Sequence, residues 1–198
     1  TKLPDFPDAA RVQPVLAAQH SQDGTRIYLA GGFQPASANR EAIVTTDMLS
    51  YHPATGRWKS EGLLPALEDS SPRTVTGGCA VSSGDSSILL IGGVNYSRFR
   101  DALNRPLLTE QATRTGNLSL RDSLQKEAQN YLLHPAGWYK FNTALLQYNT
   151  YTKHWTRLGD YEELARAGAG IANNANTIII IGGELKPGIR TPEVNAFQ

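Results

Sequence analysis

The residues with the clearest chemical potential are a carboxylate and a guanidinium close together near the end of the chain. Glu184 and Arg190 lie in the segment GELKPGIRT, with a Lys-Pro-Gly turn signal between them. A carboxyl group can take up and release a proton as a general base and acid, and a planar guanidinium can hold a carboxylate through two hydrogen bonds. We predict these catalytic roles for Glu184 and Arg190. The alternative is a salt bridge between them that pins a loop.

Three short apolar runs end in a double glycine, and the third leads directly into Glu184. They read RIYLAGGF from Arg26, SILLIGGV from Ser87 and TIIIIGGE from Thr177. Aliphatic and β-branched residues favour strands, and paired glycines permit a turn where a side chain would obstruct it. A tyrosine and a tryptophan seven residues apart follow the first two runs; these pairs are Tyr51/Trp58 and Tyr148/Trp155. We expect two strands joined by a tight turn there, with the aromatic rings packing between neighbouring sheets.

This self-similarity resembles the kelch repeat, in which each repeat is a four-stranded blade of a β-propeller. The fold prediction is therefore an all-β, kelch-type β-propeller. The blades are expected over about residues 11–60, 74–158 and 166–198, and the third ends before its fourth strand. Because propellers close with about four to eight blades, we expect residues 1–198 to be a partial propeller of under three blades. The remaining blades would lie on a missing part of the chain or on a complementary chain.

The second blade carries a long insertion between its second and third strands. From Gly93 to Tyr148 is 55 residues, whereas the matching distance from Gly32 to Tyr51 in the first blade is 19, a difference of 36. Within this insertion, at about residues 95–140, four apolar residues recur every four positions and predict a helix; they are Leu120, Leu124, Ala128 and Leu132. Asn117 or Ser119 could cap its start. The insertion is interpreted either as a lid over the propeller face or as a surface excursion.

Alternating strand direction brings several polar residues to one face of the predicted propeller. Glu184, Arg190, Asn95 and the insertion all follow the second strand of a blade. Three arginines instead precede the innermost strands, so we expect them to point toward one channel mouth; they are Arg11, Arg73 and Arg166. Gathered guanidiniums are unfavourable unless they are solvated or meet an anion. The alternative is that they pair with nearby acids, namely Asp69, Glu162 and Glu163.

Composition excludes several classes of function. The formal net charge of +1 provides no basic field for nucleic acid, so no nucleic-acid partner is expected. No apolar run approaches 18 residues, so no membrane span is predicted. Cys79 is the one cysteine and lies in an apolar strand, which favours an inert core thiol.

Four segments together resemble the bacterial N-acetylneuraminate epimerase (sialic acid mutarotase) family. They are GGVN from Gly92, the helical insertion, WYKFNTALLQYNT from Trp138 and GGELKPGIRT from Gly182. The resemblance implies a six-bladed propeller that interconverts sialic acid anomers without a cofactor, in the periplasm or outside the cell. It places the catalytic pair on Glu184 and Arg190 and a substrate contact on Arg11. One departure is Gly78, where the family resemblance leads us to expect a histidine.

The chemistry of mutarotation suits these residue types. Opening and reclosing a cyclic hemiketal needs one group that shuttles a proton, which Glu184 can supply. The sugar's carboxylate can be held by Arg190, with Arg11, Asn95 and Arg73 as further substrate-binding residues. No metal and no cofactor is required.

Two other classes of function are possible. A non-catalytic kelch interaction module could bind an acidic peptide or glycan, but the long insertion in one blade argues against it. A copper radical oxidase would need clustered Tyr, His and Cys ligands. The four histidines show no such spacing; they are His20, His52, His134 and His154.

Overall fold

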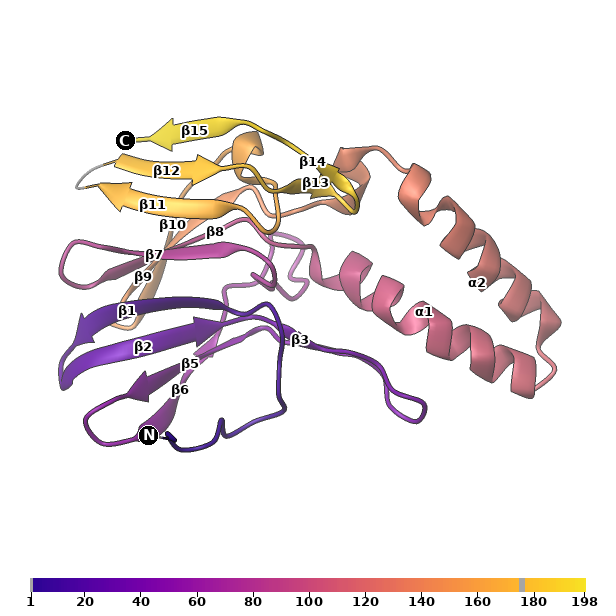
Figure 1. Ribbon diagram of the computed structural model, residues 1–198, viewed down its shortest axis with the longest axis horizontal. Helices are drawn as coiled ribbons and strands as arrows, with labels where there is room; N and C mark the ends of the chain where they lie inside the picture. Colours follow the sequence, from indigo (N-terminus) through magenta and orange to yellow (C-terminus); the bar gives the residue numbers. More distant parts are fainter. Residues whose placement is uncertain (1, 175–176) are drawn as a thin grey trace.

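The computed structural model describes residues 2–174 and 177–198, which form antiparallel sheets stacked side by side (Figure 1). The first sheet has the strand order β1-β2-β5-β6. Its strands are β1 (Val15–Ser21), β2 (Gly24–Ala30), β5 (Asp47–His52) and β6 (Arg57–Leu63). This up-and-down order is that of a propeller blade: tight turns join β1 to β2 and β5 to β6, and a longer connection joins β2 to β5.

The second sheet repeats this order and the third contains three strands, as predicted. The second consists of β7 (Cys79–Ser83), β8 (Ser87–Ile91), β9 (Ala144–Asn149) and β10 (His154–Asp160). The third consists of β11 (Gly170–Asn174), β12 (Thr177–Ile181) and β15 (Val194–Phe197). A short 3-10 turn, η3 (Glu162–Leu164), lies between these two sheets in the sequence.

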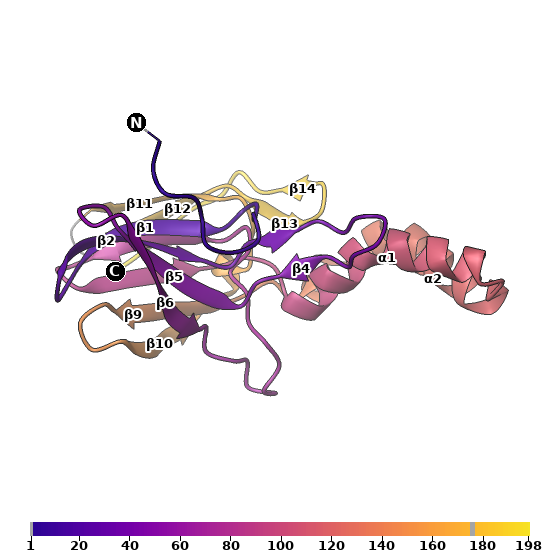
Figure 2. The same ribbon diagram turned by 90° about the horizontal axis from the view of Figure 1, so that it is seen from below.

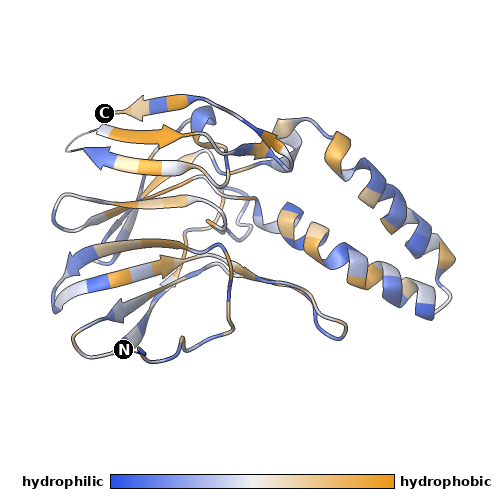
Figure 3. Cartoon of the chain, in the orientation of Figure 1, coloured by the Kyte–Doolittle hydropathy of each residue, from blue (hydrophilic) through white to orange (hydrophobic). Residues whose placement is uncertain are grey.

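Strand β8 shows how the sequence builds two cores at once. Side chains alternate along a strand, so Ile88 and Leu90 join the core between the first and second sheets. Leu89 and Ile91 join the core between the second and third. The continuous apolar run SILLI is therefore required because both faces of this sheet are buried. Figure 3 shows the corresponding run in β12 of the third sheet as strongly hydrophobic.

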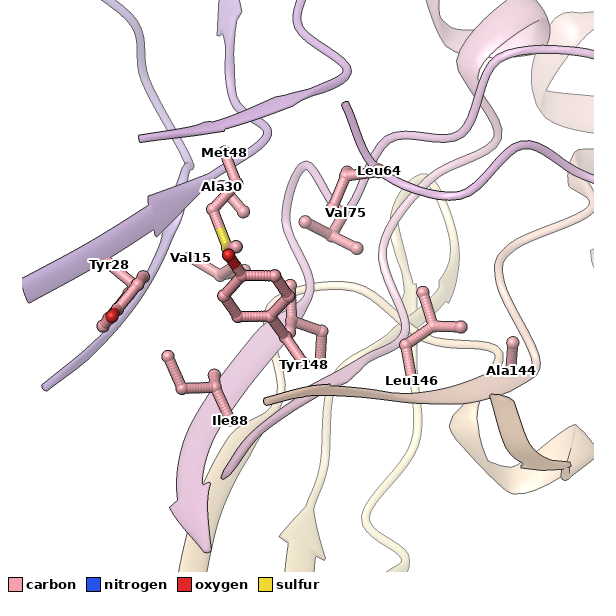
Figure 4. Packing of buried hydrophobic residues seen from close by; sticks show 11 residues of the cluster. Val15, Tyr28, Ala30, Met48, Leu64, Val75, Ile88, Ala144, Leu146 and Tyr148 are labelled. Atoms are coloured by element: carbon pink, nitrogen blue, oxygen red, sulfur yellow. The ribbon is translucent and has the colours of Figure 1, made fainter. Parts of the chain in front are cut away.

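The Tyr/Trp pairs lie only in part as predicted. Tyr51 and Trp58 are directly opposite each other on β5 and β6, and Tyr148 and Trp155 on β9 and β10. Each pair therefore packs within one sheet, with ring centroids 5.1 Å and 4.7 Å apart. The second pair also packs between sheets, as predicted, because Tyr148 and Trp155 join the core between the first and second sheets. Tyr28 of the first sheet lies against Tyr148, with ring centroids 6.0 Å apart (Figure 4).

A buried carboxylate also links the first two sheets. Glu61 accepts hydrogen bonds from Ser50 Oγ (2.6 Å) and Tyr148 OH (2.9 Å), and pairs with Lys153 Nζ at 3.2 Å. Burial by itself raises the pKa of Glu61, but these three donors outweigh it and the pKa is lowered overall. Burial and the Glu61 charge raise the pKa of Tyr28 to about 12.

The connections between the second and third strands of all three sheets emerge at one end of the molecule (Figures 1 and 2). In the first sheet the connection contains a small hairpin, β3 (Phe33–Gln34) with β4 (Ile43–Val44). In the third it is the hairpin β13 (Glu184–Lys186) with β14 (Ile189–Arg190). In the second it is the insertion, with α1 (Tyr96–Arg114), α2 (Leu118–Asn130), η1 (Tyr131–Leu133) and η2 (Ala136–Tyr139).

The insertion is a helical hairpin that projects beyond the sheets (Figure 2). Asn117 caps α2 by accepting a hydrogen bond from Leu120 N at 3.1 Å, as one of the two predicted caps. In the predicted apolar stripe, however, Leu124 is half-buried and the other three residues are exposed, and no residue of α2 is buried. Among the described residues, the base of the hairpin lies beside the sheets and its tip projects beyond them (Figure 2). Neither helix in the described part of the chain is long and apolar enough to cross a membrane.

The loops that lead into the three innermost strands share one backbone conformation. Gln13, Gly77 and Gly168 each lie two residues before a strand, with φ of 55°, 71° and 65°. Gly77 N donates to Gln13 O at 3.0 Å, and Gly168 N donates to Gly77 O at 2.7 Å. A ladder of amides thus joins one blade to the next at the end of the sheets where the connections gather. Glycine fits the left-handed conformation at two of the three positions without strain.

Candidate functional site

Glu184 and Arg190 face each other across the β13–β14 hairpin. The turn between them is Pro187-Gly188, where Gly188 has φ of 80°, as a turn with proline first and glycine second requires. The backbone of Glu184 bonds Ala167 in both directions, at 2.7 Å and 3.0 Å. The hairpin is therefore fixed to the loop that leads into β11.

The two side chains form an ion pair, with Arg190 Nη2 3.0 Å from Glu184 Oε1. The Arg190 side chain is 74% exposed and that of Glu184 32%. An exposed pair of this kind adds little to stability. The predicted salt bridge therefore exists, but its exposure leaves both groups accessible to a ligand.

Lys186 ties this hairpin to the insertion. Its ammonium donates to the carbonyl oxygens of Leu132 (3.0 Å) and His134 (2.7 Å), just beyond α2. Charge-assisted bonds of this kind are stronger than neutral ones. The position of the Glu184/Arg190 pair thus depends on the insertion, 52 residues away in the sequence from Lys186 to His134.

A cavity of about 710 Å³ opens beside the ion pair, and we call it the first cavity. Its floor is backbone, from the amide ladder and the neighbouring glycines. Its walls come from the three connections, with an aromatic group from the β3–β4 hairpin and the insertion: Phe33, Phe99, Tyr131, Tyr139 and Phe141. Among the described residues that line it, Glu184 is the one carboxylate. A polar pair at the edge of an apolar concavity is the usual form of a small-molecule site.

The start of α1 supplies the polar groups on the opposite wall. Asn95 caps the helix, and its Oδ1 accepts a hydrogen bond from Arg98 N at 3.1 Å. Arg98 stacks over Trp138, with the guanidinium carbon 4.0 Å from the ring centroid, and Trp138 stacks on His134. In the described part of the chain, the Arg98 guanidinium makes neither an ion pair nor a hydrogen bond. It is therefore held by ring stacking, and its five N–H groups remain available to a ligand.

Arg98 was absent from the sequence prediction, although the sequence contains a signal for it. It lies in the first turn of α1, where no acidic residue is present. A cation there opposes the helix dipole. Such a placement leaves a cation at the end of the helix whose dipole favours anions, beside the first cavity.

Arg11 does not line the first cavity, and the prediction that it contacts substrate is corrected. Its side chain is 3% exposed and pairs with Asp47 at 2.8 Å and Asp8 at 2.7 Å. It also donates to Gly31 O at 3.2 Å. Its physical role is to bind the first glycine of the Gly-Gly turn to the third strand of the blade.

Arg166 occupies the equivalent place in the third sheet. It donates to Gly182 O at 3.0 Å and pairs with Glu193 at 3.3 Å. The predicted convergence of three arginines on one channel mouth is therefore wrong, and their acid partners are different from those expected. In the second sheet Asn142 makes the corresponding bond, from Nδ2 to Gly92 O at 3.0 Å.

Arg73 is buried beneath a different cavity. It is 6% exposed, and its Nε donates to Pro65 O at 3.0 Å. It does not line the cavity that contains Glu184. Of the residues predicted from sequence, the structure brings together Glu184, Arg190 and Asn95, and it separates Arg11 and Arg73 from them.

Gly78 lies in the wall of the first cavity, where the family resemblance led us to expect a histidine. A Cβ at this position would be 2.5 Å from Ile91 O. The backbone in this conformation therefore has no room for any side chain there.

Two tyrosines, the buried Tyr139 and the half-buried Tyr131, contribute phenol groups to the same cavity. Burial raises the pKa of Tyr139 and Tyr131, so both stay protonated at neutral pH. Tyr139 OH donates to Tyr131 O. Among residues 2–174 and 177–198, no three His, Cys, Asp or Glu side chains gather into a potential metal site.

Comparison with known sequences gives a consistent result. A family model described as N-acetylneuraminate epimerase matches residues 1–198. The N-acetylneuraminate epimerase of Haemophilus influenzae (strain PittEE) is 29% identical over 194 residues, which cover 98% of this chain and 46% of the relative. That of Yersinia enterocolitica is 28% identical, over 98% of this chain and 45% of the relative. The chain thus spans about half the length of the curated relatives it matches.

A solved structure described as "Structure of YjhT" matches with a TM-score of 0.75 and 24% identity. The match covers 100% of this chain and 55% of that chain. At this identity the likeness shows the fold alone. With the strand order of the sheets, it confirms the predicted partial β-propeller.

Proposed function

The chain belongs to the N-acetylneuraminate epimerase family, and from that premise we propose that the complete protein interconverts the α and β anomers of N-acetylneuraminate. The observation that carries the proposal is the accessible Glu184/Arg190 pair at the edge of the first cavity. A carboxyl group is the proton-transfer group that mutarotation requires.

In the proposed reaction, Glu184 removes the proton from the anomeric hydroxyl. The bond between the anomeric carbon and the ring oxygen breaks, its electron pair goes to the ring oxygen, and that oxygen takes up a proton from the carboxyl group or from water. The former anomeric carbon is now the ketone carbon, and rotation about the bond that joins it to the sugar chain turns its other face toward the hydroxyl group. Closure from the other face reverses each proton transfer and returns Glu184 to its starting state, so no net proton and no cofactor is consumed.

Two guanidiniums are available for the sugar's carboxylate. Arg190 pairs with Glu184 through Nη2, and the rest of its guanidinium is exposed. It can therefore hold the sugar's carboxylate close to the proton-transfer group. Arg98 approaches from the opposite wall without an acidic partner in the described residues. The Asn95 side chain has its amide N–H groups available for a hydroxyl or the N-acetyl oxygen. The aromatic wall suits the apolar face of a sugar ring.

Anomer exchange in the complete protein tests this function directly. Saturation-transfer NMR of N-acetylneuraminate is expected to show exchange between the two anomers well above the rate in buffer. Exchange at the buffer rate, with a folded protein and saturating ligand, would contradict the proposal. A periplasmic or secreted location is a further part of the proposal that rests on family resemblance; cell fractionation tests it.

A further inference from the structure

A second cavity, of about 570 Å³, lies on the other side of the first turn of α1. It shares Asn95, Arg98 and Phe141 with the first cavity but contains neither Glu184 nor Arg190. Its remaining walls come from the connection between the first two sheets, the segment before β9, and β10. The described residues that line this cavity belong to the segments that lead from the first sheet to the second, to β10 and to the insertion between β8 and β9.

The base of the second cavity is the buried guanidinium of Arg73. The residue is 6% exposed, and Nε has its acceptor in Pro65 O. The two Nη groups make no hydrogen bond or ion pair with the described residues. Burial, and next the neighbouring charge of Arg157, lower the pKa of Arg73, while the nearby carboxylates of Asp160 and Glu68 act in the opposite direction. The Nη atoms are not among the fully buried polar atoms that lack a partner, so solvent reaches them, and an oxyanion could accept hydrogen bonds from them there.

The opposite wall is the N-terminus of the 19-residue helix α1. Asn95 satisfies the N–H groups of Arg98 and Phe99, through its side chain and its carbonyl oxygen. The N–H groups of Tyr96 and Ser97 have no such partner among the described residues, and Ser97 lines the cavity. Helix N-termini favour anions because these N–H groups and the helix dipole act together.

The carboxylates around the second cavity already have donors. Arg157 pairs with Glu68 and Asp160, both at 2.5 Å. Asp69 accepts from Ser71 N (2.9 Å) and Ser71 Oγ (2.5 Å). Lys140 lies at the exposed rim and makes no ion pair in the described chain. Arg73 and Lys140 thus stay outside any ion pair among the described residues, although Lys140 is close enough to lower the pKa of Asp69.

From this geometry we propose that the second cavity binds a small oxyanion, phosphate or carboxylate, between the Nη groups of Arg73, the first N–H groups of α1 and the ammonium of Lys140. A planar guanidinium can bind either oxyanion through two parallel hydrogen bonds. The site is separate from the proposed catalytic site and does not depend on the anomerisation proposal. Because α1 begins in the wall between the two cavities, an anion here also fixes the position of Asn95.

The test is a titration of the complete protein with inorganic phosphate and, separately, with acetate. The signals to follow in ¹H–¹⁵N NMR are Ser97 N–H and Arg73 Nε–H. We expect saturable shifts of both signals with at least one anion. A response to phosphate alone identifies a phosphate-type ligand, and a response to acetate alone identifies a carboxylate.

Matched variants locate the bound anion. Arg73→Gln is expected to lower the affinity about tenfold or more, and Lys140→Gln about threefold. Arg190→Gln, in the first cavity, is the control and is expected to keep the parent affinity. If Arg73→Gln does not fold, the anion affinity of the exposed Lys140→Gln variant is the test: a loss of affinity supports the site, and an unchanged affinity contradicts it.

Three outcomes overturn the site. The first is no saturable response to either anion. The second is unchanged affinity in Lys140→Gln together with unchanged affinity in a folded Arg73→Gln. The third is loss of binding in Arg190→Gln alone, which would place the anion in the first cavity.

Discussion

Arg11–Asp47 and Arg190–Glu184 are both arginine–carboxylate pairs, and the structure gives them opposite roles. The Arg11 side chain is 3% exposed and also bonds the backbone of Gly31. The Arg190 side chain is 74% exposed, and its partner lines a cavity. Burial and the number of protein acceptors, rather than residue type, separate a structural pair from a candidate catalytic one.

The third sheet strengthens this comparison. Arg166 repeats the Arg11 arrangement by bonding the first glycine of its own Gly-Gly turn and an acid near its third strand. The second sheet achieves the same backbone bond with Asn142 and no arginine. The bond to the glycine carbonyl is thus the shared requirement of the blade, and a guanidinium is one of two ways to meet it.

The largest effect is expected from Glu184→Gln. This nearly isosteric change removes proton transfer and keeps hydrogen bonding, so the anomer exchange rate of the complete protein should fall about 10²–10⁴-fold. Affinity for N-acetylneuraminate and the melting temperature should remain close to those of the parent. If the pair only pinned its hairpin, the melting temperature would fall while the exchange rate per folded molecule was retained.

Arg11→Gln, in contrast, should mainly lower the stability of the fold. It leaves the buried side of Asp47 and the Gly31 carbonyl without their donor, which should cost about 3 kcal/mol of unfolding free energy. Urea denaturation of the complete protein measures this, with Arg190→Gln as the matched control that should change it by less than about 1 kcal/mol. Equal losses in the two variants would remove the distinction between the pairs.

Arg190→Lys tests whether the exposed pair binds the carboxylate of the sugar. The charge stays, but the planar fork is lost, so binding of N-acetylneuraminate should weaken by about 1–3 kcal/mol. The methyl ester of the sugar, which has no carboxylate charge, should be affected much less. Calorimetry that shows the same loss for both ligands would argue against a carboxylate contact.

The smallest effect concerns pH and a third kind of carboxylate, the buried Glu61. Its pKa is lowered in the folded state, so its contribution to stability is complete above the usual glutamate pKa and is lost as pH falls through the folded-state pKa. Glu61→Gln should therefore cost about 1–2 kcal/mol at neutral pH, and progressively less in acid. Denaturation midpoints from about pH 7 to about pH 3 test this; a constant difference would contradict it.

The strands and the Glu184/Arg190 hairpin could be predicted because their signals are local. Apolar runs closed by Gly-Gly define the strands, and the Pro-Gly turn brings two nearby residues opposite each other. Helix α1 was missed because it has no buried apolar stripe of regular period and contains Pro106. The buried ion pair of Arg11 could not be predicted, because its acceptor Asp47 lies 36 residues away in the sequence. Which acid lies opposite Arg11 depends on the register of the strands.

The amide ladder from Gln13 to Gly77 to Gly168 has a mechanical consequence. Each blade is fastened to its neighbour by a backbone bond at the floor of the first cavity, and by apolar packing between the sheets beyond it. We therefore expect the floor to be rigid. The helical hairpin is held at its base and by the hydrogen bond from Ala42 N to Asn104 Oδ1 (2.6 Å), and we expect its outer part to be more mobile. Motion that admits or releases a ligand would then come from the helical hairpin and from the hydrogen bonds that Lys186 makes to it, while the spacing between the blades stays constant.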